Sequence, residues 1–205
     1  MKNFIISLIG LFCFSLFSQN AMAQKIAVTK GKLDFLKGET TLKIEFNYDK
    51  CKVGSKSEAD YTDETVKKKN KEKPGSGDKW IKAWEEAKND MYAPKFEVLF
   101  NENMTKKGIV ANRTENEAKY TMIVYVTRLE PGYNIGVSRK NAEIDVEIVF
   151  VETANPDNIL AKITELKSPG ATWGGNDYEV GVRVSEAFAK CAKSLGIFLT
   201  KKIPK

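Results

Sequence analysis

The chain contains no histidine among its 205 residues. This absence excludes nucleophiles that a histidine activates and metal sites built on imidazole ligands. The sequence also has no G-x-S-x-G motif, and Gly75-Ser76-Gly77 lacks the spacing and the lysine of a phosphate-binding loop. Catalysis by paired carboxylates stays open, but no spacing in the sequence selects a pair among the 27 acidic residues.

Long apolar segments are scarce, and the one clear example lies at the start of the chain. Phe4 to Phe17 is mostly apolar, follows Lys2, and precedes the small-x-small cleavage pattern Ala21-Met22-Ala23. Leu11-Phe12 stand before Cys13 where lipid attachment needs small residues, so no lipid anchor is expected. Residues 1–23 are therefore predicted to be a signal peptide, and the product is expected to be periplasmic or secreted.

The remaining residues 24–205 are predicted to form a single domain without a transmembrane segment. Their number, 205 − 23 = 182, is ample for one hydrophobic core. Only one of the 33 basic residues lies in the predicted signal peptide, so residues 24–205 contain 32 basic and 27 acidic residues and have a net charge of +5. This mild excess is spread through the chain and does not indicate nucleic acid as a partner.

Cysteine is rare too, since only Cys51 and Cys191 follow the predicted cleavage site. In an exported protein, these two cysteines have two alternative interpretations. A disulfide between them would close a long loop and stabilise the fold by about 4–5 kcal/mol. Alternatively, Cys191 is a small core residue, because it lies at the centre of the apolar stripe of the last helix.

Hydrophobic periodicity predicts an α+β fold with a mostly antiparallel sheet. Residues 25–48 read as an N-terminal hairpin, and alternation over 120–129, 142–150 and 159–166 predicts a C-terminal three-stranded meander. Between these two groups of strands, apolar residues at helical spacing predict helices, the first of which begins after Ser57, a good N-cap. A long amphipathic helix over 179–202 ends the chain, and the helices are expected to cover one face of the sheet.

Three clusters in these elements have both a functional and a structural interpretation. The outward row Glu143, Asp145 and Glu147 suits either a divalent cation or, as we favour, a cross-strand ladder with Arg128 or Lys162. The lysine run over 67–73 suits anionic lipid or glycan, although a solvated helix face is the favoured interpretation. Trp80 and Trp84 share a helix face that can bind a sugar ring or a partner, but such spacing is more typical of core.

Two loops combine aromatic faces with amides and charges and are the candidate binding sites. Mixtures of this kind recognise glycans and peptides, although Gly, Asn and Asp also serve ordinary turns. The candidate residues are Tyr133, Asn134 and Arg139 in the first loop, and Trp173, Asn176, Asp177 and Tyr178 in the second. No catalytic residues, metal ligands or cofactors are expected.

Three stretches of the chain resemble a family of exported Bacteroidetes proteins to which no activity is assigned. They are Gly77-Asp78-Lys79-Trp80 with Trp84, Tyr92-Ala93-Pro94-Lys95-Phe96, and Glu130-Pro131-Gly132-Tyr133-Asn134. The resemblance covers most of the chain after the signal peptide and implies no functional residues. More distantly, the order of elements is similar to small periplasmic domains of envelope lipoproteins and secretion-channel subunits.

The leading hypothesis is an exported, non-enzymatic protein with an envelope-associated binding or assembly role, with an envelope protein or a glycan as partner. A carboxylate-based hydrolase acting on glycans is the alternative, and it requires two acids about 5–10 Å apart in a cleft. A third hypothesis is a subunit of an envelope complex, which an exposed apolar patch would mark.

Overall fold

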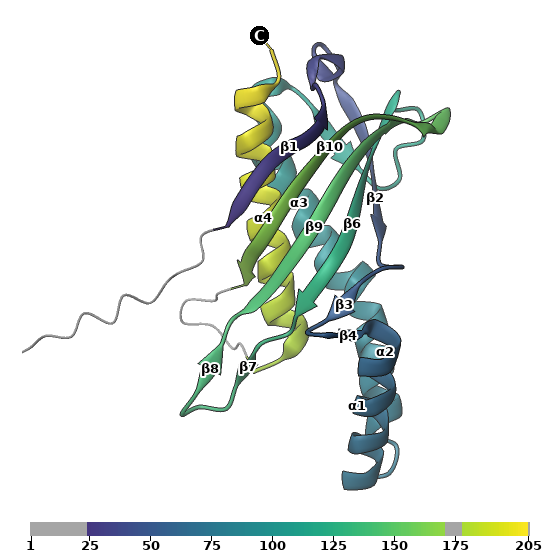
Figure 1. The fold of residues 1–205 in the computed structure, drawn as a ribbon, viewed down its shortest axis with the longest axis vertical. Coiled ribbons are helices and arrows are strands. Elements are labelled where there is room, and N and C mark those ends of the chain that lie inside the picture. The colour runs from purple at the N-terminus through teal and green to yellow at the C-terminus, as the bar shows by residue number, and fades with distance from the viewer. Residues whose placement is uncertain (1–23, 171–177, 205) are drawn as a thin grey trace, which may run out of the picture.

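The computed structural model describes residues 24–170 and 178–204. The chain has the predicted α+β class, with a layer of helices behind a sheet (Figure 1). The strands are β1 (Lys25–Gly31), β2 (Thr41–Asn47), β3 (Lys52–Val53), β4 (Lys56–Ser57), β5 (Val110–Asn112), β6 (Tyr120–Glu130), β7 (Tyr133–Asn134), β8 (Arg139–Lys140), β9 (Ala142–Glu152) and β10 (Asn155–Gly170). The helices are α1 (Glu58–Glu72), α2 (Ser76–Ala87), α3 (Ala93–Met104) and α4 (Val180–Lys202), with a π-helical segment, Lys88–Tyr92, between α2 and α3.

The predicted C-terminal meander is confirmed, because β6, β9 and β10 pair antiparallel in chain order. Along β9, Ile144, Val146 and Ile148 are fully buried, whereas the acidic residues between them are partly exposed. One face of the sheet therefore belongs to the core, as period-two alternation requires.

The predicted N-terminal hairpin is wrong, and the sheet is mixed rather than mostly antiparallel. β1 pairs antiparallel with β10 at one edge, whereas β2 lies between β6 and β5 and runs parallel to both. The connection between β1 and β2 is not a tight turn. Leu33 and Leu36 are buried in and beside a 3-10 turn, Asp34–Leu36, which takes the chain from one side of the meander to the other. Alternation identifies both strands, but their partners lie far along the chain.

Helices α3 and α4 cover one face of the sheet, as predicted (Figure 1). The apolar stripe of α4 is fully buried at Val184, Ala187, Phe188, Cys191, Leu195 and Leu199. Helices α1 and α2 differ from the prediction, because they form a pair, here called the α1–α2 arm, that extends past the lower end of the sheet. The arm is tightly packed: a Cβ at Gly77 would lie 2.4 Å from the carbonyl oxygen of Val66.

The outward acidic row of β9 forms the predicted ladder. Arg128 donates from Nε and Nη2 to both oxygens of Asp145, at 2.6 and 3.1 Å, and reaches Glu143 at 3.2 Å. Lys162 on β10 donates to Glu147 at 2.9 Å. Each acid of the row thus has a cross-strand basic partner, which stabilises the open face of the sheet.

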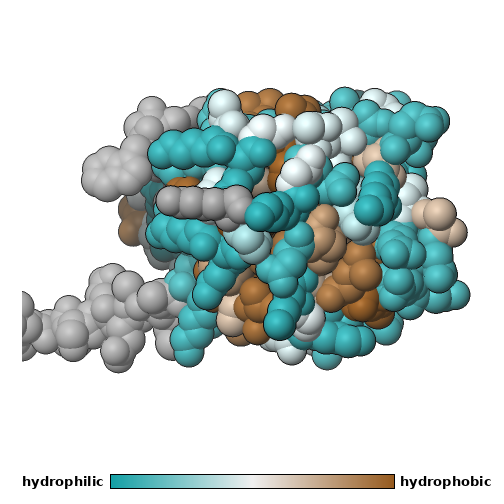
Figure 2. All heavy atoms as spheres, turned by 90° about the horizontal axis from the view of Figure 1, so that it is seen from above, coloured by the Kyte–Doolittle hydropathy of each residue, from teal (hydrophilic) through white to brown (hydrophobic). Residues whose placement is uncertain are grey.

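No helix among the described residues is long and apolar enough to cross a membrane. Figure 2 looks down on the end of the molecule opposite the α1–α2 arm. Hydrophilic residues predominate on that end, and hydrophobic residues lie in separate patches.

Candidate functional site

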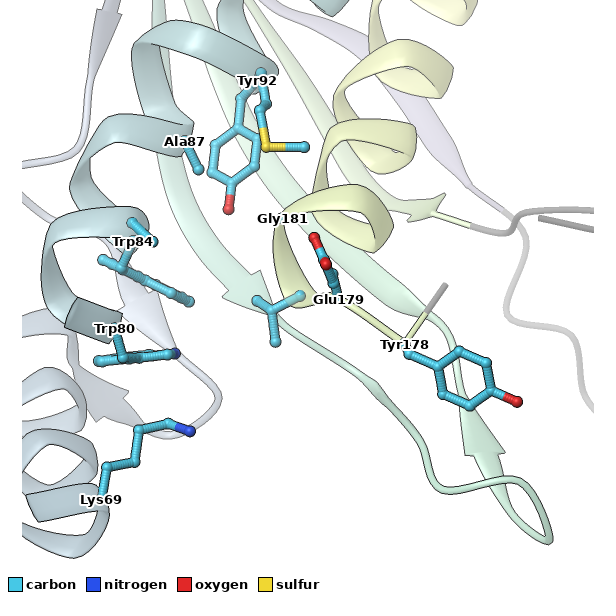
Figure 3. Close-up of a pocket in the computed structure, with 11 residues that line it drawn as sticks. Lys69, Trp80, Trp84, Ala87, Tyr92, Tyr178, Glu179 and Gly181 are labelled. Carbon is cyan, nitrogen blue, oxygen red and sulfur yellow. The ribbon is translucent and has the colours of Figure 1, made fainter. Parts of the chain in front are cut away.

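A cavity of about 370 Å³ opens between the α1–α2 arm and the start of α4 (Figure 3). This volume is within the range of protein pockets for small ligands, near its lower end. The lining residues are Lys69, Trp80, Ala83, Trp84, Ala87, Met91, Tyr92, Tyr178, Glu179, Val180 and Gly181. Most are aromatic or aliphatic, so the cavity is suited to an apolar group.

Trp80 and Trp84 form the wall on the arm side and belong to an aromatic cluster that also contains Tyr61. The ring centroids of Trp80 and Trp84 are 5.3 Å apart, and those of Tyr61 and Trp84 are 5.4 Å apart. Trp84 is buried, which confirms the core interpretation for this residue, whereas Trp80 is only half-buried. The helical spacing of four residues places both indoles on one face, and that face is shared between core and cavity.

Glu58, at the start of α1, fixes the orientation of the buried indole. Its Oε1 accepts a hydrogen bond from Trp84 Nε1 at 2.7 Å and lies 2.9 Å from Lys88 Nζ. The backbone N–H of Asp60 donates to Ser57 Oγ, so Ser57 is the N-cap that the sequence predicts. The indole N–H is thereby already occupied, and Trp84 offers its ring rather than a donor to a ligand.

Tyr92 lines the cavity, and its buried hydroxyl has no hydrogen-bond partner among the described residues. Figure 3 shows the Tyr92 ring between α2 and α4, with its hydroxyl pointing toward the other lining residues. Burial, and secondarily the charge of Glu58, raise the pKa of this hydroxyl, so it stays protonated at neutral pH. A buried hydroxyl without a partner costs stability, so a ligand atom that pairs with it gains a hydrogen bond and removes that penalty.

Local backbone geometry places Tyr92 there. It is the last residue of the π-helical segment, which comes just before Pro94 at the first turn of α3. Proline cannot donate to the carbonyl four residues earlier, so the regular helical hydrogen bonding is interrupted at this point. Across the cavity, α4 comes close, because a Cβ at Gly181 would lie 3.0 Å from Met91 Sδ.

Two charged residues are part of the cavity lining. Lys69 of α1 lies on one side and Glu179, at the start of α4, on the other (Figure 3). Tyr178, beside Glu179, is 65% exposed. The lining thus combines a mostly apolar surface with a few polar groups, as in pockets that take an anchoring side chain.

The structure separates the residues that the sequence predicts for binding. Tyr178 lines the cavity, but the first loop does not contribute to its lining: Tyr133 and Asn134 form β7, and Arg139 begins β8. The Tyr133 hydroxyl lies 3.2 Å from Ser138 Oγ within this small hairpin. Trp173, Asn176 and Asp177 lie outside the described residues, so their predicted role stays a prediction.

Cys51 and Cys191 do not form a disulfide in the structure, and both are buried free thiols. Their surroundings differ, since Cys51 is near Glu58 and Lys88 whereas Cys191 lies beneath the sheet next to Glu165. Burial raises the pKa of the Cys51 thiol to about 12. Neither cysteine is therefore a reactive nucleophile.

Glu165 is the most unusual carboxyl group in the described part of the chain, because it is fully buried. Its Oε1 accepts from the Gln24 amide and, at 2.5 Å, from Ser194 Oγ, but its Oε2 has no hydrogen-bond partner. Burial raises its pKa to about 7, although the hydrogen bonds of Ser194 and Gln24 oppose the shift. Full burial keeps this acid away from any substrate.

Two acids, Asp49 and Glu147, line a second cavity of about 290 Å³ on the open face of the sheet. Glu147 is held by Lys162, and Asp49 accepts a hydrogen bond from Asn47 Nδ2 at 2.9 Å. Residues 24–170 and 178–204 contain no group of three cysteine or acidic side chains that could hold a metal ion.

Comparisons with known proteins give a likeness of fold only at a low level. No protein-family model and no curated protein matches the chain. A solved PelC dodecamer from Paraburkholderia phytofirmans is 11% identical, with a TM-score of 0.42, and the match covers 89% of this chain and 100% of that one. A variant of that PelC dodecamer in another crystal form is 11% identical, with a TM-score of 0.36 and coverage of 82% and 96%.

Proposed function

We propose that the protein is an exported, envelope-associated assembly protein without catalytic activity, located in the periplasm or secreted. Its cavity between α2 and α4, lined by Trp80, Trp84 and Tyr92, receives an apolar side chain of an envelope partner protein. The observation that carries the proposal is the mostly apolar, aromatic lining of the cavity, which includes Tyr92 with its buried and unpaired hydroxyl.

The polarity of the cavity favours a protein side chain over a glycan. A sugar ring brings several hydroxyl groups, and each needs a hydrogen-bond partner once it is buried. The lining offers few, namely the Tyr92 hydroxyl, the Trp80 indole N–H and the charged ends of Lys69 and Glu179. An apolar side chain followed by a backbone carbonyl needs only one donor, and aromatic-lined pockets are typical centres of protein interfaces.

Photocrosslinking in intact cells tests this proposal. A photoreactive phenylalanine analogue replaces Ala83, an exposed residue at the cavity, and in a control chain it replaces Val98, an exposed residue of α3. Position 83 is expected to give an adduct with one envelope protein that position 98 does not give. Adducts with glycan alone, or the same adducts from both positions, would contradict the proposal.

A glycan hydrolase using Asp49 and Glu147 is the second candidate, favoured by their presence in one cavity. In this function the Asp49→Asn variant loses all release of reducing ends from envelope glycans, while its thermal stability changes little. Absence of any release by the unmodified chain would remove this candidate.

A further inference from the structure

The β7–β8 hairpin presents two apolar side chains to solvent at its tip. Ile135 is 66% exposed and Val137 is 96% exposed. The tip is nevertheless an ordered turn, because the backbone N–H of Ile135 donates to the Ser138 carbonyl at 3.0 Å and that of Gly136 to Asn134 Oδ1 at 2.9 Å. The fold thus holds these side chains away from the core instead of burying them.

The end of the α1–α2 arm carries a concentration of positive charge. Residues 67–79 contain six lysines and two acids, a net charge of +4 in 13 residues. One of these lysines, Lys67, pairs with Asp63 at 3.6 Å, and one acid, Asp78, accepts a hydrogen bond from Asn70. Lys68, Lys71 and Lys73 are exposed on the arm.

Both features project from the same end of the molecule, below the sheet (Figure 1). The hairpin adds Arg139 and Lys140 just behind its apolar tip, and Lys140 pairs with Glu130 at 2.7 Å. This arrangement combines apolar side chains that can enter a membrane interface with basic side chains that can remain at the headgroups.

We propose that this end of the molecule docks on an anionic phospholipid surface. Ile135 and Val137 enter the interface, while Lys68, Lys71 and Lys73 of the α1–α2 arm lie against the phosphate groups. The observations that select lipid are charge complementarity and an ordered apolar tip rimmed by basic residues. The biological meaning rests on the proposed envelope location, but the docking surface does not use the cavity.

Flotation of the chain from Gln24 onward with lipid vesicles tests the docking surface. Vesicles of phosphatidylglycerol and phosphatidylethanolamine are compared with vesicles of phosphatidylcholine. The protein is expected to float with the anionic vesicles only, and 0.5 M NaCl should release most of it because salt screens the lysines. Equal binding to both vesicle types, or none to either, would overturn the proposal.

Two sets of variants separate the apolar and the basic contributions. The double change Ile135→Asp with Val137→Asp is expected to lower the partition coefficient by at least about tenfold. The triple change Lys68→Gln, Lys71→Gln and Lys73→Gln should lower it by about tenfold to a hundredfold, since each lysine near an anionic surface strengthens binding by up to about fivefold. All these positions are exposed, so circular dichroism should show an unchanged fold.

Val98→Asp, which places one aspartate on an exposed valine of α3 away from the hairpin, is the control. It should leave flotation unchanged, and an equal loss in this variant would refute the assignment of the tip. If the protein does not float but position 83 still gives its specific adduct in cells, the docking surface alone is refuted. Flotation without a specific adduct would refute the proposed function alone.

Discussion

Replacing Glu165 with glutamine should make the protein more stable at neutral and alkaline pH. The carboxyl group is fully buried, and one of its oxygens has no hydrogen-bond partner. Glutamine has nearly the same shape but no charge, so it avoids the cost of a buried carboxylate. Ser194 and the Gln24 amide can still donate to its carbonyl oxygen.

The size of the effect follows from the pKa of Glu165. Burial raises it from 4.5 to about 7 in the folded chain, which corresponds to about 3 kcal/mol of stability. Because the folded state binds this proton more tightly, the contribution is fully present below pH 4.5. It is lost progressively as the pH rises to about 7 and is absent above that value.

Urea unfolding at pH 5 and pH 8 measures this difference. The parent chain should lose about 2–3 kcal/mol more than Glu165→Gln between the two pH values. Glu117→Gln, the same chemical change at an exposed residue, is the control and should behave like the parent. A parent and a Glu165→Gln variant with the same pH dependence would refute the assignment of the raised pKa.

Three further predictions concern packing and exposure. Gly77→Ala should lower the free energy of unfolding by about 1–3 kcal/mol in urea titrations, because the added methyl group meets the Val66 carbonyl across the α1–α2 arm; an unchanged midpoint would contradict this contact. Asp145→Ala should lower the free energy of unfolding by about 2 kcal/mol, since it removes hydrogen bonds from Arg128 and from the Lys167 N–H. Glu143→Ala should lower it by only about 0.5 kcal/mol in the same assay, because Glu143 accepts one bond from Arg128. Equal losses in the two variants would argue against this ranking. A thiol reagent should label neither Cys51 nor Cys191 in the native chain and both in denaturant, and no labelling in denaturant would instead indicate a disulfide.

Local periodicity was sufficient to predict α4 and the three strands of the meander. Their apolar residues repeat at 3.6 or 2 positions, and the buried faces match those repeats. The partner of a strand is not local information. Ile26 and Val28 have the alternation of a strand, but they pair with Glu165 and Ile163 rather than with β2. Leu33 and Phe35 continue an apolar pattern, although the chain there forms a 3-10 turn.

The candidate site shows the same limit. The spacing of Trp80 and Trp84 identified a shared helix face, but the cavity exists only because the start of α4 faces that wall. Glu165 lies two residues after Ile163, and alternation alone would have placed it on the core face. Its partner Ser194 is supplied by α4, so the sequence did not reveal that the acid is held there.

The most direct test of the central claim is the yield of the adduct from position 83 in a Tyr92→Phe background. Removal of the unpaired hydroxyl should leave the melting temperature unchanged or higher, because a buried polar group without a partner is lost. The same change should lower the adduct yield several-fold, because the partner loses its buried hydrogen bond, worth about 1 kcal/mol. An unchanged yield from a stably folded variant would contradict the assignment of this cavity as the binding site.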